Sequence, residues 1–182
     1  MFIGIHAQIA PSRPAVINSA TGETMTYRDL DERSNQFAQY LAANGVKRGD
    51  TVALFMENNM RFMEIVWATR RSGLYLTAVN RYLMADEAAY IINDSDAVVV
   101  VASKARGEVA SALTQRLPNC RRLLMTDGTI EGWSSYENAV APFPVAPVAE
   151  EWIGELIALQ FRHDRSPQGR EACHAPCESG RG

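Results

Sequence analysis

Short, uniformly apolar runs alternate with longer amphipathic segments along most of the chain. Four runs are too short for a helix and apolar at nearly every position, which is typical of strands buried on both faces of a parallel sheet. They are Thr51–Phe55, Tyr75–Val79, Ala97–Ala102 and Arg122–Met125. The segments between them are long enough for about three helical turns. We therefore predict an α/β fold, with a mainly parallel sheet flanked by helices.

The first long amphipathic segment has clear start and stop signals. Thr26 precedes it and Asp29 follows three residues later, which is the spacing of a capping box. Gly45 follows the last apolar position and is a natural helix terminator. Between these signals, one face recurs at helical spacing through Leu30, Ser34, Phe37 and Leu41.

Local signals predict the remaining elements. Asn58 or Asn59 can cap a second helix, which Gly73 ends. Ala85–Glu87 begins a third helix with its carboxylates at the positive end of the helix dipole. The other predictions are a fourth helix over Lys104–Arg116, a hairpin of Pro14–Asn18 with Glu23–Thr26, and an extended, proline-rich linker over Pro142–Pro147.

Composition places the chain among ordinary globular proteins. Its 182 residues are 47% hydrophobic and 21% charged, and the formal net charge of −3 disfavours a nucleic-acid-binding protein that acts through a basic face. The longest apolar run is far shorter than a membrane helix, and the N-terminus lacks the features of a signal peptide. Three cysteines make no disulfide framework. We expect a cytoplasmic protein with one domain-sized body.

Residues that could carry chemistry are sparse in this body. No G-x-G-x-x-G follows a predicted strand, and the turn Met56–Asn59 has no glycine to admit a pyrophosphate closely. A nucleotide-binding oxidoreductase is therefore disfavoured. The H-E-x-x-H and G-x-S-x-G motifs are also absent from the sequence. We predict no catalytic, cofactor-binding or metal-binding residue in this chain.

Individual candidates have simpler structural explanations. His6, in a short N-terminal helix, is expected to be a surface imidazole, Cys120 a small buried hydrophobe, and Trp67 part of the core. The methionines expected to fill gaps in the core are Met56, Met60 and Met63. The basic pairs expected at solvated faces or helix C-termini are Lys47–Arg48, Arg70–Arg71 and Arg121–Arg122.

Several phrases, in this order and spacing, resemble a known family. T-Y-x-[DE]-L stands at Thr26–Leu30, and G-[VL]-x-x-G-D-x-V-A at Gly45–Ala53. Further matching positions are His6–Ala7, Pro14–Val16, Ser34–Asn35, Asn58–Asn59, Gly73, Asn80–Arg81 and Asp86–Ser95. Over roughly residues 5 to 155, the chain resembles the N-terminal region of AMP-forming acyl-CoA synthetases, in the adenylate-forming ligase superfamily. Met84 departs from the pattern, because such proteins often have a helix-capping Thr there.

The resemblance implies an activity for intact members of the family. They activate a carboxylic acid, such as a fatty acid, with ATP and Mg²⁺ to acyl-AMP and pyrophosphate, and then transfer the acyl group to coenzyme A. Their N-terminal part is scaffold, and a phosphate-binding loop, typically Y-S-S-G-T-T-G-R-P-K-G, follows it. That loop does not appear in this sequence. We therefore predict a truncated, inactive ligase that binds no cofactor by itself.

The tail can encode the missing loop in another reading frame. When each codon of Leu159–Arg170 is read one base later, the permitted codons spell Y-S-S-G-T-T-G-R-P-K-G-V without a forbidden position. A frameshift near Gly154–Ile157 explains this agreement. The sequence thus predicts two parts: 1–155, the N-terminal part of an AMP-binding ligase domain, and 156–182, an out-of-frame, disordered tail.

Two alternatives remain open. A metal site in the tail would use His163, Cys173, His174 and Cys177, but their crowded spacing lacks the two separate ligand pairs of structural zinc. Alternatively, the body is a stand-alone α/β binding or interaction module without catalysis. Truncation would leave sheet edges and apolar faces uncovered, which favours self-association.

Overall fold

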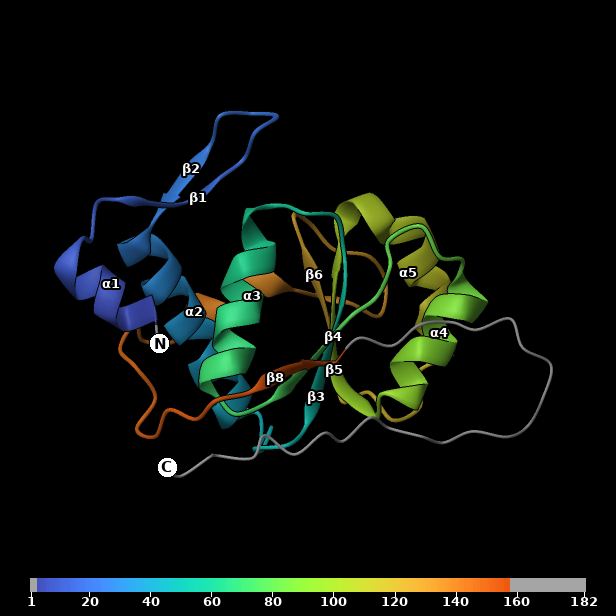
Figure 1. Cartoon of the computed structure of the whole chain (residues 1–182). Coiled ribbons are helices and arrows are strands. Elements are labelled where there is room, and N and C mark those ends of the chain that lie inside the picture. Colours follow the sequence, from blue (N-terminus) through green and yellow to red (C-terminus); the bar gives the residue numbers. More distant parts are fainter. Residues whose placement is uncertain (1–2, 158–182) are drawn as a thin grey trace, which may run out of the picture.

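The computed structural model describes residues 3–157, and within them a six-stranded parallel sheet is the centre of the fold (Figure 1). The strand order is β7-β6-β5-β3-β4-β8, and every neighbouring pair is parallel. This confirms the predicted α/β class. The strands are β3 (Thr51–Phe55), β4 (Tyr75–Ala78), β5 (Ala97–Ser103), β6 (Arg122–Thr126), β7 (Ser134–Ser135) and β8 (Glu155–Ile157).

Helices cover both faces of the sheet, with α2 and α3 on one side and α4 and α5 on the other (Figure 1). A short helix, α6, packs with α2 and α3. The helices are α1 (Ile3–Ile9), α2 (Tyr27–Ala43), α3 (Met60–Arg71), α4 (Ala85–Asp94), α5 (Gly107–Leu113) and α6 (Tyr136–Val140).

Strand β3 shows why its residues are apolar throughout. All five are buried, and successive side chains point to opposite faces of the sheet. Val52 and Leu54 pack in the core beneath α2 and α3, whereas Ala53 and Phe55 pack in the core beneath α4 and α5. Because β3 has a core on each side, neither of its faces is polar, and its sequence shows no alternation of apolar and polar residues.

Helix α2 begins and ends at the predicted residues. The Thr26 hydroxyl accepts the Asp29 N–H, and the Asp29 carboxylate accepts the Thr26 N–H, so the capping box is present. At the other end Gly45 has φ +74°. The N–H groups of Gly45 and Val46 donate to the carbonyls of Ala42 and Leu41, which is a Schellman motif.

The next two helices begin with different caps. The Asn59 side chain accepts the Phe62 N–H at the start of α3, which confirms one of the two predicted caps. Met84 precedes α4, and its side chain has no oxygen that could accept a hydrogen bond. The Glu87 carboxylate still accepts the Met84 N–H at 3.0 Å, so α4 has half of a capping box.

The predicted hairpin is present as β1 (Pro14–Ile17) and β2 (Thr24–Thr26), which pair antiparallel and project beside α1 and α2 (Figure 1). The predicted fourth helix is shorter than expected. A 3-10 turn over Lys104–Arg106 precedes α5, which ends at Leu113. Helix α5 starts at Gly107 itself, and residues 114–116 of the predicted helix lie in a turn beyond its end.

Candidate functional site

The carboxyl ends of the parallel strands are the first place to look for a site. From β3 the chain crosses through α3 to β4 on one side, and from β4 it returns through α4 to β5 on the other. The connection after β3 and the connection after β5 therefore run in opposite directions, so the gap between these two strands is the switch point of the sheet. Open α/β sheets bind ligands outside the strand ends at such a switch point.

Glu57 lies at this switch point, just beyond β3. Its carboxylate accepts the hydroxyl of Ser103 at the end of β5 and, at 3.1 Å, the side-chain amide of Asn59. Burial opposes ionisation of Glu57, but the hydrogen bonds from Ser103, its own backbone and Asn59, together with the charge of Arg106, keep its pKa below the usual value. The carboxylate thus links the ends of β3 and β5, and its oxygens already accept hydrogen bonds from the protein.

Glycines beyond the carboxyl ends of the strands are where a nucleotide phosphate could approach the backbone. Gly107 and Gly128 are the glycines beyond the carboxyl ends of strands within residues 3–157. A phosphate needs open glycine backbone to approach closely. Instead, the Lys104 side chain lies against both glycines, and Ile130 also covers Gly107. Gly49, Gly73 and Gly154 precede strands and so lie at the amino ends of the strands, on the opposite side of the sheet from the carboxyl ends.

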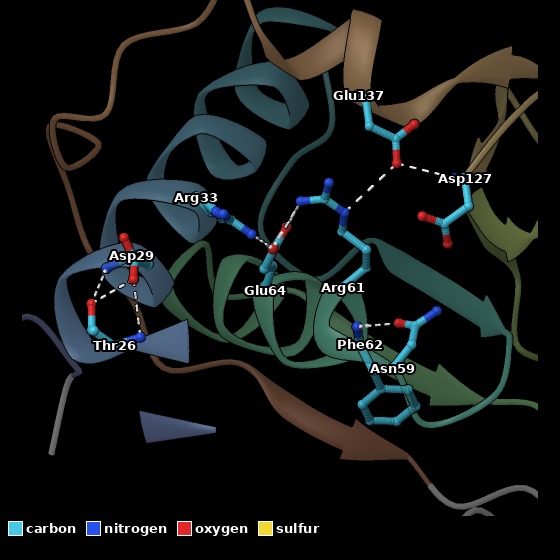
Figure 2. A network of polar contacts seen from close by, with 9 residues as sticks. All are labelled: Thr26, Asp29, Arg33, Asn59, Arg61, Phe62, Glu64, Asp127 and Glu137. Carbon is cyan, nitrogen blue, oxygen red and sulfur yellow. Dashed lines mark hydrogen bonds and ion pairs between the residues drawn. The ribbon is translucent and has the colours of Figure 1, made fainter. Parts of the chain in front are cut away.

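Figure 2 shows an ionic network around the buried Glu64, between α2, α3 and α6. Glu64 is 1% exposed, and its carboxylate lies 3.0 Å from both Arg33 of α2 and Arg61 of its own helix. Arg61 also reaches Glu137 of α6 at 3.6 Å, and Glu137 accepts the Asp127 N–H at 3.1 Å. The network ties α2, α3 and α6 together. None of these four charged residues lines the cavity beside α1 or the one beside β8.

Tyr136 is buried beside this network. Burial raises the pKa of its hydroxyl well above the usual value, and the nearby Glu64 carboxylate raises it further. Its ring packs against Phe37 of α2, with 5.1 Å between the ring centroids. Tyr136 therefore acts as an apolar core residue, a role that the sequence analysis did not assign to it.

Arg71 corrects one prediction. Arg70–Arg71 does end α3 as expected, but the Arg71 side chain is 1% exposed and not solvated. It lies 2.6 Å from Asp31 of α2 and 3.5 Å from Glu151. An arginine is buried when carboxylates neutralise it, and these partners are 40 and 80 positions away in the sequence. The other five members of the basic pairs are exposed.

The remaining candidates have packing roles. His6 is half-buried and stacks on Tyr27 at 5.1 Å. Cys120 donates to the Ala97 carbonyl, and burial raises the pKa of its thiol to about 11, which disfavours the reactive thiolate. Met56 and Met60 are buried, while Met63 and Trp67 pack against a small core beside α1. The tail residues His163, Cys173, His174 and Cys177 lie outside the described residues.

An apolar cavity of about 500 Å³ lies where α3 meets β4 and β8. Ile153, just before β8, and Leu156 of β8 line it and are both 66% exposed. Its floor includes Phe62, Val66 and Leu76. The cavity holds no cluster of ionisable groups that could carry out chemistry. Within residues 3–157 it is an open apolar surface at the edge of the sheet.

No helix within residues 3–157 is both long and apolar enough to cross a membrane. Within the same range, no group of three or more His, Cys, Asp or Glu side chains is arranged to hold a metal ion.

The described part of the chain is an α/β domain with a parallel sheet covered on both faces. Comparison with known structures places this domain. The chain superposes with a TM-score of 0.74 on a structure from Rhodopseudomonas palustris described as a long-chain-fatty-acid CoA ligase, at 24% identity. The match covers 85% of this chain and 39% of the other. The fold is therefore that of part of an acyl-CoA ligase.

The family follows from the sequence. The profile of the AMP-binding enzyme family matches residues 5–161, and the chain belongs to that family. A medium/long-chain-fatty-acid–CoA/3-oxocholest-4-en-26-oate–CoA ligase of Mycolicibacterium smegmatis is 26% identical over 153 residues, or 79% of this chain and 27% of the relative. FadD13, a long-chain-fatty-acid–CoA ligase of Mycobacterium tuberculosis, is 28% identical over 127 residues, or 70% and 24%. The chain spans about a quarter of these relatives.

Proposed function

We propose that this chain is the N-terminal scaffold of an AMP-forming carboxylate–CoA ligase. The observation that supports this most is the family match over residues 5–161 together with coverage of about a quarter of the relatives. The intact protein would activate a fatty acid with ATP and Mg²⁺ to acyl-AMP and transfer the acyl group to coenzyme A, in the cytoplasm. In this proposal the scaffold supplies sheet and helices, and later segments supply the reacting groups.

The chain alone is inactive in this proposal. Preorganised donors around the phosphates provide most of the rate in such reactions, and within residues 3–157 the side chains of Lys104 and Ile130 lie against the glycines at the carboxyl ends of the strands. ATP–pyrophosphate exchange tests this with the pure 182-residue chain and a panel of fatty and aromatic acids. An intact relative serves as the positive control. We expect no acid-dependent exchange, and clear exchange would refute the proposal.

A frameshift is the second part of the proposal. Its position in this proposal is near Gly154–Ile157, so that Leu159–Arg170 are read out of frame. The pairing of Glu155–Ile157 in register with β4 supports a change of frame at the C-terminal end of that range. Sequencing the gene tests this directly. Codons 159–170 that fail to spell the phosphate loop one base later would rule the frameshift out.

A stand-alone binding or interaction module is the second candidate. The closed packing of both cores, with the sheet covered on each face, supports it. Size-exclusion chromatography and thermal melting separate the two candidates. A monodisperse monomer with one cooperative transition favours a module, whereas insoluble or loosely packed material favours an incomplete ligase domain.

A further inference from the structure

Strand β8 needs more than its own sheet contacts to stay in place. It has three residues, lies at the edge of the sheet, and pairs only with β4 among the described strands. Glu155 and Leu156 are exposed. A short edge strand with few buried contacts opens easily. Its position must therefore depend on the segment that leads into it.

That segment, residues 142–151, runs along α2, and we call it the strap. Three amide side chains of α2 donate to strap carbonyls: Asn35 to Val145 at 2.8 Å, Gln36 to Phe143 at 3.0 Å, and Gln39 to both Ala146 and Pro147 at 3.1 Å. The strap contains three prolines. Proline limits backbone freedom, so ordering the strap costs less entropy than ordering an ordinary loop.

Side chains fix the two ends of the strap. Near its start, the ring of Phe143 packs edge-on against Tyr40 of α2, with 5.7 Å between centroids. At its end, Glu151 lies 3.5 Å from the buried guanidinium of Arg71. The strap is therefore bound along its length, although its sequence predicted a simple extended linker.

Residues 152–154, which we call the anchor, dock on the end of α3. The N–H of Trp152 donates to the Arg71 carbonyl at 2.8 Å, and the N–H of Gly154 to the Arg70 carbonyl at 2.7 Å. The last carbonyls of a helix have no partner within the helix. The anchor thus satisfies the Arg71 carbonyl and gives the Arg70 carbonyl a shorter hydrogen bond than the one at 3.3 Å from the Gly73 N–H, and this contact sets where β8 begins.

The anchor also fits closely against its surroundings. A Cβ added to Gly73 would lie 2.7 Å from the Trp152 Cβ, and one added to Gly154 would lie 2.1 Å from the Leu74 carbonyl oxygen. Above the indole, the Arg48 guanidinium lies 4.0 Å from the ring centroid. Such a cation–π contact stabilises the docked ring.

We propose that the strap and the anchor form a latch, so that residues 142–157 dock and open as one unit while the rest of the sheet stays folded. In this device, the amides of α2 control the position of β8 from a distance, through the strap. Opening would expose the edge of β4. The latch goes beyond the proposed function and does not depend on it.

Hydrogen exchange measured by mass spectrometry on the full chain tests the latch. The double variant Gln36→Met/Gln39→Met removes three strap hydrogen bonds with nearly unchanged side-chain shape, and Trp152→Ala removes the anchor ring. We expect each to speed exchange in residues 152–157 by about tenfold, with no change in β5. Trp152→Phe should restore most of the protection. Val145→Ala is the control, because the strap bond of Val145 uses its carbonyl.

Two results would overturn the latch. If residues 152–157 exchange at the same rate in the double variant as in the wild type, the strap does not hold β8 in place. Equal acceleration in β5 and β8 would mean that β8 opens only with the whole domain. Protection of β5 in each variant also shows whether that variant is folded.

Discussion

At the scale of single residues, buried charge is the most consequential feature. Glu64 is 1% exposed, and its two arginine partners are partly exposed. The sequence places Glu64 in a helix and gives no sign of its burial. Removing one member of a buried ion pair leaves the other charge without compensation, which costs more than the pair contributes.

Glu64→Gln should therefore destabilise the protein by about 2 kcal/mol, less than for a fully buried pair because Arg33 and Arg61 keep contact with water. Urea denaturation measures the change in free energy of unfolding. Asp86→Asn is the matched control, since Asp86 is 88% exposed in its pair with Arg116. That control should change stability by less than about 0.5 kcal/mol. Equal effects of the two substitutions would contradict a special role for burial.

The capping carboxylate of Asp29 should make stability depend on pH. Hydrogen bonds from the side chain and backbone of Thr26 hold the pKa of Asp29 below its usual value. The stability that it contributes is therefore complete above about pH 3.9, the usual pKa, and is lost as the pH falls through the lower folded-state pKa. Asp29→Asn should lose less stability than the wild type between pH 5 and pH 3 in urea melts. Parallel pH curves for the two proteins would exclude this contribution.

At the scale of elements, caps and turns were predicted best. The capping box of α2, the Asn59 cap of α3 and the terminating Gly45 are all present. Each depends on residues within four or five positions, so the sequence contains the whole interaction. Strands β7 and β8 and helix α6 were not predicted. Elements of two to five residues are too short to show periodicity. Strand β8 forms because it pairs with β4 and because the residues before it hydrogen-bond to the end of α3.

The incomplete cap of α4 offers a stabilising substitution. Met84→Thr would add the hydroxyl that accepts the Glu87 N–H, while the Glu87 carboxylate already accepts the Met84 N–H. We expect about 0.5–1 kcal/mol of added stability. Thermal unfolding measures it, and Thr26→Ala, which removes the equivalent hydroxyl of α2, should lower stability by a similar amount. A lower melting temperature for Met84→Thr would show that packing of Met84 outweighs the cap.

At the scale of the whole molecule, the edge at β8 differs from the rest of the surface. Ile153 and Leu156 are exposed there beside the apolar cavity, and the outer side of β8 has no neighbouring strand among the described residues. Natural sheets protect such edges with charged residues. An uncovered edge of this kind favours association between copies of the chain.

Leu156→Lys should therefore reduce self-association, because it places a charge on the exposed edge. Light scattering across a concentration series measures the apparent mass of both proteins. Tyr82→Lys is the control, since Tyr82 is 73% exposed but lies before α4 and away from this edge. Equal effects of the two substitutions would point to general surface charge, and a monomeric wild type would exclude association through this edge.

The sequence by itself determined the alternation of strands and helices, the caps and the family resemblance, because these depend on near neighbours and on the order of motifs. Tertiary structure alone decided the order of the strands, the burial of Arg71 and Glu64, and the docking of residues 142–157. Asp31 reaches Arg71 across 40 positions, and Asn35 reaches Val145 across 110. Which distant groups meet is set by how the helices pack on the sheet, and no local pattern of residues records that packing.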